Sequence, residues 1–168
     1  ILGSGESSRL NVHLVQKKQI ASQVNVEYEM TSLYQAPFML FVTPAEKHSL
    51  SDVKAALLDE IKLLQTTLVS PKELDKVKNQ LIAQKIYAKD AMFEQAMNIG
   101  NTVIIGLPAE AVNTEIDKLK AITPQQIQQV AREYLQPKRQ TVAALVPQSL
   151  APMTQKEMQP FSQGGAIR

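Results

Sequence analysis

The strongest constraint on the fold is an alternation of apolar and polar residues between Ile20 and Thr31. A period of two places successive side chains on opposite faces of a β-strand, so this stretch predicts a strand with one buried and one wet face. A more continuously apolar stretch, Phe38 to Thr43, follows a short link that ends in Pro37. Such a short link predicts two neighbouring antiparallel strands. The first strand alternates Val24, Val26, Tyr28 and Met30 with Gln23, Asn25, Glu27 and Glu29.

Helix-start signals divide the rest of the chain. Ser49, Ser70 and Thr123 are each followed three positions later by an acidic or amide residue, and Pro follows Ser70 and Thr123 directly. These are N-cap, capping-box and first-turn signals, so we expect helices to begin at all three points. Residues 9–18 and 109–120 also predict helices. The helix after Ser70 is expected to be long, to be buried on more than one side, and to end or kink near Gly100 or residues 106–108.

A third strand is expected near the end of the chain, from Thr141 to Val146. The order of helix, strand, strand, several helices and strand predicts an α+β fold, with helices packed on one face of an antiparallel sheet. Residues 148–168 are rich in Gln, Pro, Ser and Gly without a period, which predicts a mobile tail. The predicted domain therefore comprises residues 1–147.

Composition excludes several functional classes. The chain has no cysteine, which rules out disulfides, thiolate metal sites and cysteine nucleophiles. Its formal net charge is +2, with Lys and Arg interleaved with Asp and Glu, so no basic stripe for nucleic acid is present. No apolar run approaches the roughly 20 residues that span a bilayer.

No residue is assigned a catalytic, cofactor-binding or metal-binding role from the sequence. His13 and His48 lack a His or Glu partner at the spacing of zinc-peptidase motifs, so both are predicted to be surface or boundary residues. The acidic side chains of the helices are predicted to lie on helix surfaces: Asp59, Glu60, Glu73 and Asp75.

The polar face of the first strand is the remaining candidate surface. Asn25 and Glu27 share this face. It is either simply solvated, as one face of an antiparallel sheet often is, or it lines a chamber or contacts an extended peptide.

Three segments resemble the C-terminal, inactive half of insulinase/pitrilysin-like zinc metallopeptidases, in the bacterial group related to mitochondrial processing peptidase. The Gly-rich start that leads into Ser8-Arg9-Leu10 is the first segment. Residues 70–81 and 122–131 match the long helix and the closing helix of the family. The resemblance covers residues 1–147 and implies a domain truncated at its N-terminal edge, with a free surface that could self-associate.

The resemblance implies that zinc is bound in the full-length protein but outside this chain, in the N-terminal half of the same polypeptide. Related second halves often carry an Arg and a Tyr that hold substrate, and Val15 and Ser22 occupy those positions here. A partner subunit is therefore expected to supply the Arg and Tyr. The candidate substrate-facing residues are Val15, Ser22, Asn25 and Glu27.

The function implied is the substrate-chamber half of a zinc-dependent metalloendopeptidase, which hydrolyses peptides but is not active as this fragment alone. The alternative is a non-enzymatic scaffold, or a peptide-binding subunit, of the same fold. The resemblance favours the bacterial periplasm or cell envelope. No nucleic-acid partner is expected.

Overall fold

The computed structural model describes residues 1–3 and 5–146, and the tail predicted for residues 148–168 lies outside this part. The strands β1 (Ala21–Tyr28) and β2 (Phe38–Pro44) form an antiparallel pair, as predicted. Val24 lies opposite Val42 and Val26 opposite Leu40, with an irregularity between Ala21 and Gln23. These valines and leucine are partly buried against the core, so the apolar face of the alternation is the inner one up to Val26. Tyr28 and Met30, which were predicted to continue this face, are exposed.

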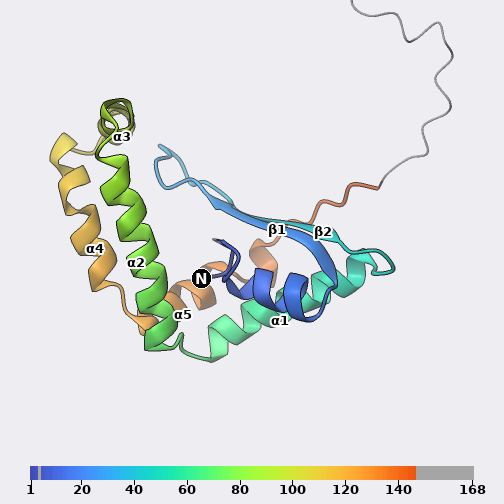
Figure 1. Ribbon diagram of the computed structural model, residues 1–168. Coiled ribbons are helices and arrows are strands. Elements are labelled where there is room, and N and C mark those ends of the chain that lie inside the picture. The colour runs from blue at the N-terminus through green and yellow to red at the C-terminus, as the bar shows by residue number, and fades with distance from the viewer. Residues whose placement is uncertain (4, 147–168) are drawn as a thin grey trace, which may run out of the picture.

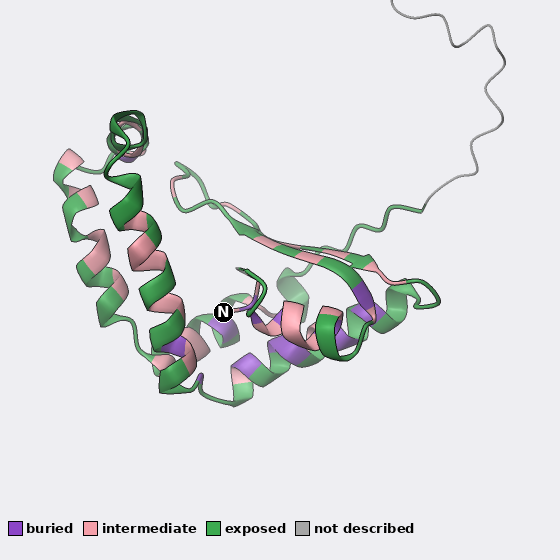
Figure 2. Ribbon diagram, viewed as in Figure 1, coloured by how far each residue is buried: buried purple, intermediate pink, exposed green. Residues whose placement is uncertain are grey.

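Three helices pack around this hairpin and form the body of the molecule (Figure 1). They are η1 (Asn11–Lys17), α1 (Leu50–Thr66) and α5 (Pro124–Tyr134). In Figure 1, η1 and α1 lie on one side of the sheet, and α5 packs against α1. The α+β fold with helices against an antiparallel sheet is confirmed. The core that these elements share includes Leu10, Leu14, Ala56, Leu64 and Ala131 (Figure 2).

The helix predicted over residues 9–18 is present, but most of it is wound as a π-helix. The amide of Lys18 donates to the carbonyl of His13, five residues back, at 2.9 Å. Leu10, just before this π-helix, and Leu14, within it, are both fully buried in the core. A π-turn is rare and costs hydrogen-bond geometry, so it persists here because tertiary packing holds it.

The remaining helices form an arm that projects away from the sheet (Figure 1). The arm consists of α2 (Pro71–Ala88), α3 (Met92–Ile104), the 3₁₀ segment η2 (Ala109–Thr114) and α4 (Glu115–Ala121). The helix predicted after Ser70 is thus interrupted at residues 89–91, continues through Gly100, and ends before Gly106. The prediction that it is buried on more than one side was wrong, because Ile86 and Phe93 are exposed.

One further expectation fails, near the end of the described chain. Thr141 to Val146 follows the 3₁₀ turn η3 (Pro137–Arg139) without forming a strand, and Leu145 is 92% exposed. A strand exists only with a paired neighbour, and the sheet of the described residues ends at β1 and β2.

Each of these strands has one edge without a neighbour in that sheet, and self-association through these edges stays a prediction. No helix among the described residues is long and apolar enough to cross a membrane.

The start of the chain packs closely against β1. A Cβ built on Gly3 would lie 2.0 Å from Cγ2 of Val26, a distance no real contact permits. The amides of Arg9 and Leu10 donate to the carbonyls of Ile1 and Leu2 at 3.0 Å, which holds the segment in place. Only glycine therefore fits between this segment and the strand.

We predict that Gly3→Ala destabilises the chain by about 1–3 kcal/mol, because the added methyl overpacks the contact with Val26. Gly100→Ala is the matched control, since a Cβ there meets nothing within 4 Å and alanine is the better helix former. Urea unfolding followed by circular dichroism measures both. Equal midpoints for wild type and Gly3→Ala would contradict the close approach.

Candidate functional site

The outer face of the hairpin is the candidate site. A shallow hollow on it is lined by three residues of β1 and two of β2: Gln23, Asn25, Glu27, Phe41 and Thr43. The strand register places Asn25 opposite Phe41 and Gln23 opposite Thr43, so the five side chains belong to one face. Phe41 is 49% exposed, so its phenyl ring is accessible to a ligand. The hollow therefore combines polar groups with an accessible aromatic ring.

Within the hollow, one oxygen of the Glu27 carboxylate is fixed by a neighbour. The side-chain amide of Asn25 donates to Oε1 of Glu27 at 2.7 Å. Among the described residues, no Lys, Arg or His nitrogen lies within 4.0 Å of this carboxylate. Glu27 is therefore a held negative charge that no cation of the described chain neutralises.

The four predicted substrate-facing residues are only partly brought together. Asn25 and Glu27 are neighbours in the hollow. Ser22 is exposed at the irregularity of β1, where its hydroxyl donates to the carbonyl of Thr43 at 3.3 Å. Val15 lies on η1 and packs, half-buried, against the core. Phe41 and Thr43 were missed from the sequence, because only the register shows which β2 residues share a face with Asn25.

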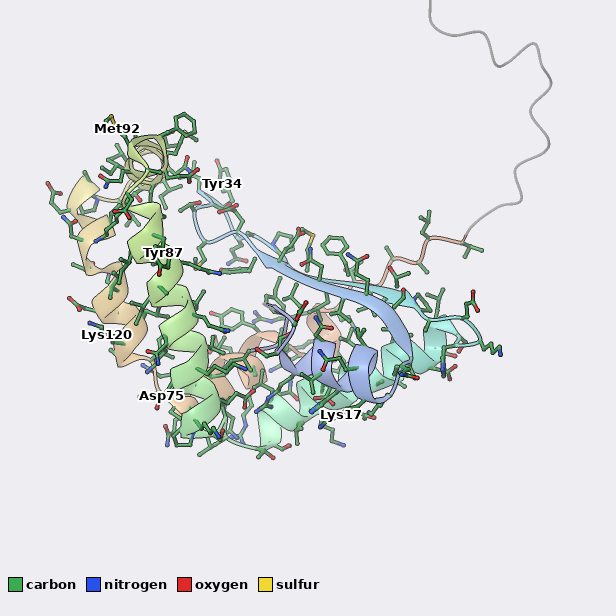
Figure 3. All side chains as sticks on the ribbon, in the orientation of Figure 1. Lys17, Tyr34, Asp75, Tyr87, Met92 and Lys120 are labelled. Carbon is green, nitrogen blue, oxygen red and sulfur yellow. The ribbon has the colours of Figure 1, made fainter. Side chains whose placement is uncertain are left out.

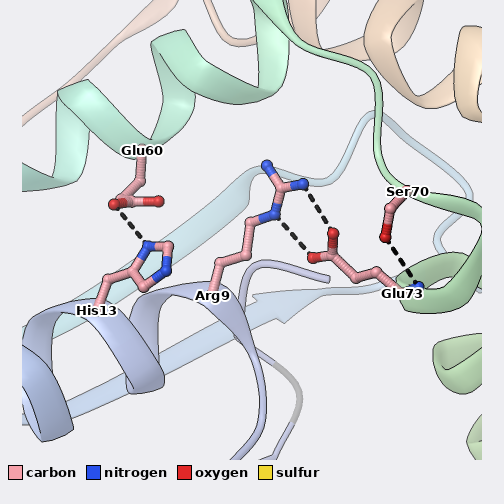
Figure 4. Close-up of polar contacts among 5 residues, drawn as sticks. All are labelled: Arg9, His13, Glu60, Ser70 and Glu73. Atoms are coloured by element: carbon pink, nitrogen blue, oxygen red, sulfur yellow. Dashed lines mark hydrogen bonds and ion pairs between the residues drawn. The ribbon is translucent and has the colours of Figure 1, made fainter.

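A second polar cluster joins the body to the arm (Figure 4). Arg9, which precedes η1, donates from Nε and Nη2 to the two carboxylate oxygens of Glu73 at 2.7 and 2.8 Å. These charge-assisted hydrogen bonds hold the pKa of Glu73 below, and the pKa of Arg9 above, their ordinary values. Glu73 was predicted as a surface charge and a capping-box residue. Only the Ser70 half of that box forms, because the Glu73 carboxylate is turned toward Arg9.

His13 contacts a carboxylate that the sequence analysis misplaced. Nδ1 of His13 lies 2.8 Å from Oε1 of Glu60, and Glu60 is only 6% exposed (Figure 4). The prediction that Glu60 is a helix-surface charge was therefore wrong. A signal was present, since Glu60 falls on the same helical stripe as Ala56 and Leu64, both of which are buried.

These residues do not fit a zinc ion. A protein zinc site uses at least three side-chain ligands, and no group of three His, Asp or Glu side chains occurs among the described residues. His13 and Glu60 come together, but the surface depression beside them is also lined by Lys17 and Lys18. Two ammonium groups beside the pair oppose a divalent cation.

Residues 1–81 match the family profile described as "Peptidase M16 inactive domain". These residues, just under half of the chain, are therefore similar to the inactive domain of M16 peptidases. The match covers η1, β1, β2, α1 and the first part of α2, and these residues include the hollow and the contacts of Arg9 with Glu73 and of His13 with Glu60. The resemblance to the inactive half of insulinase/pitrilysin-like zinc metallopeptidases is thereby confirmed. No curated protein matches the chain significantly.

Three solved structures share the fold of this chain. The inactive peptidase domain of a candidate zinc protease from Bordetella parapertussis aligns over 91% of this chain and 82% of its own, with TM-score 0.74 and 18% identity. A candidate zinc protease from Bordetella pertussis Tohama I aligns over 88% and 81%, with TM-score 0.76 and 17% identity. A protease from Helicobacter pylori aligns over 82% of this chain, with TM-score 0.72 and 20% identity. The chain spans only 33% of that protease.

We predict that Glu73→Gln lowers the free energy of unfolding by about 1–3 kcal/mol at neutral pH, because it removes a partly buried, charge-assisted pair. The folded-state pKa of Glu73 is lowered, so its stabilising contribution is present above the unfolded-state pKa and is lost as the pH falls through the folded-state value. The difference from wild type should therefore shrink on acidification. The control is Asp75→Asn, which removes a carboxylate charge from an exposed position of the same helix, α2 (Figure 3). A pH-independent difference in denaturant titrations would argue against the pair.

We predict that His13→Ala destabilises the chain by about 2–4 kcal/mol, since it leaves the buried Glu60 carboxylate without its ring partner. His48→Ala removes the other histidine of the chain, which is exposed in the turn before α1, and should change stability by less than about 0.5 kcal/mol. Thermal unfolding of the two variants gives the comparison. Similar melting temperatures would show that the His13 contact contributes little.

Proposed function

We propose that this chain forms one wall of a peptide-binding chamber in a zinc-dependent metalloendopeptidase and takes no catalytic part itself. The observation that carries the proposal is the outer face of the hairpin, which is exposed and carries a hollow of polar and aromatic side chains. The match of residues 1–81 to an inactive-domain family supports the non-catalytic part.

The proposal assigns the zinc to the N-terminal half of the same polypeptide. It assigns the Arg and Tyr that would hold substrate to a partner subunit. Val15 has no hydrogen-bond donor on its side chain, and the Ser22 hydroxyl is short and donates to Thr43 in its own sheet, so neither can replace them. We also propose the bacterial periplasm or cell envelope as the location.

A non-enzymatic peptide-binding subunit of the same fold is the second candidate. The occurrence of Val15 and Ser22 in place of an Arg and a Tyr favours it, because a subunit that only binds peptide needs no group to stabilise a transition state. The two candidates share the peptide-binding face. They differ in whether the rest of the protein hydrolyses what this face holds.

We predict that the chain alone, supplied with zinc, does not cleave labelled casein, and that a short extended peptide perturbs the backbone amides of β1 and β2. Nuclear magnetic resonance titration measures the perturbation, and fluorescence release measures the cleavage. A chelator-treated sample is the control for trace metal. Zinc-dependent cleavage would overturn the non-catalytic assignment, and perturbations confined to α3 and α4 would overturn the assignment of the binding face.

A further inference from the structure

Neither strand of the hairpin carries a basic residue, a property that the hairpin shares with residues 90–117 of the arm. No Lys or Arg occurs between Lys18 and Lys47, although the chain has 18 of them, whereas Glu27, Glu29 and Glu46 all lie in this interval. The segment that forms both strands therefore carries only negative side-chain charge, in a chain whose net charge is +2. This separation of charge places a negative potential on the proposed peptide-binding wall.

Hydrogen bonds hold two of these acidic side chains in place. Asn25 holds Oε1 of Glu27 in the hollow. Glu29, two positions further along, accepts hydrogen bonds from the hydroxyl and the amide of Thr31 at 2.6 and 3.0 Å, and these bonds lower its pKa. A hydrogen-bonded carboxylate disfavours an anionic ligand and pairs with a cation.

The exposed phenyl ring gives the hollow its second property. Phe41 lies opposite Asn25 across the two strands, on the same face as Glu27 and diagonal to it. An ammonium or guanidinium group beside a carboxylate gains further attraction from the face of a neighbouring ring. The apolar stem of a Lys or Arg side chain also covers exposed aromatic surface.

We propose that this hollow binds a Lys or Arg side chain of an extended peptide. The proposal rests on the proposed function, because it takes the outer face of β1 and β2 as the peptide-binding wall, and it adds the chemical class of side chain that the wall selects. Glu27 supplies the charge, Asn25 positions it, Phe41 stacks on the bound side chain, and Gln23 and Thr43 line the hollow beside them.

The test compares fluorescein-labelled extended peptides that are identical except at a central position. One carries arginine there, one carries citrulline, which has the same shape without the charge, and one carries glutamate. Fluorescence anisotropy measures their binding to the full chain. An exposed ion pair and a cation–π contact are each weak, so we expect arginine to bind about three- to tenfold more tightly than citrulline. Glutamate should bind most weakly, and added salt should reduce the preference.

Two variants locate the preference. Glu27→Gln keeps an oxygen for the Asn25 amide but removes the charge, and should bring the arginine and citrulline affinities together. Phe41→Leu keeps an apolar side chain without the ring and should reduce the preference partly. Glu94→Gln removes the same charge from an exposed position of α3 and should leave the preference unchanged.

The outcomes separate this proposal from the proposed function. Equal binding of the arginine and citrulline peptides at β1 and β2 would overturn the basic side-chain preference and leave the binding wall intact. An arginine preference that survives in Glu27→Gln would also overturn it. Failure of every peptide to bind would overturn both.

Discussion

The burial of Leu10 and Leu14 between the sheet and α1 is the contact on which the rest of the structure depends. Both side chains are fully buried, and they bring η1 into contact with β1 and α1. Once η1 is in place, Arg9 reaches Glu73 at the start of the arm, and His13 reaches Glu60 on α1. The apolar contact thus positions two polar contacts that are directional and less tolerant of displacement. The outer face of the hairpin is open because all of this packing is on the inner face.

Local signals in the sequence predicted the elements that depend on local chemistry. The capping boxes of Ser49 and Thr123 form as expected, and the alternation from Val24 to Tyr28 gives β1 its two faces. Thr141 to Val146 has a similar strand-like composition but forms no strand, because pairing requires a neighbour that composition does not specify. The interruption of the arm at residues 89–91 carries no Pro or Gly that would have marked it.

The sequence predicted residues of the candidate site on β1 but none on β2. Asn25 and Glu27 share a face by the period of two, and their hydrogen bond confirms that they are neighbours. Phe41 belongs to the site because the register between the strands places it opposite Asn25, and the sequence of β1 does not determine this register. The contacts of Glu73 with Arg9 and of Glu60 with His13 were unpredictable for a related reason. Glu60 and Glu73 are 47 and 64 residues from their partners, and each pair forms only when η1 docks.

Glu73 is suited to two different interactions, a capping hydrogen bond within its own helix turn and an ion pair with the distant Arg9. In an unfolded chain, a glutamate three positions after Ser70 is suited to cap the first turn of its own helix. In the folded chain its carboxylate is paired with Arg9 instead, and Ser70 alone caps the turn. Folding therefore exchanges a short-range hydrogen bond for a long-range one at the base of the arm. The free energy gained from the ion pair is reduced by the cap it replaces, and the first turn of α2 acquires its final hydrogen bonds only after the body has assembled.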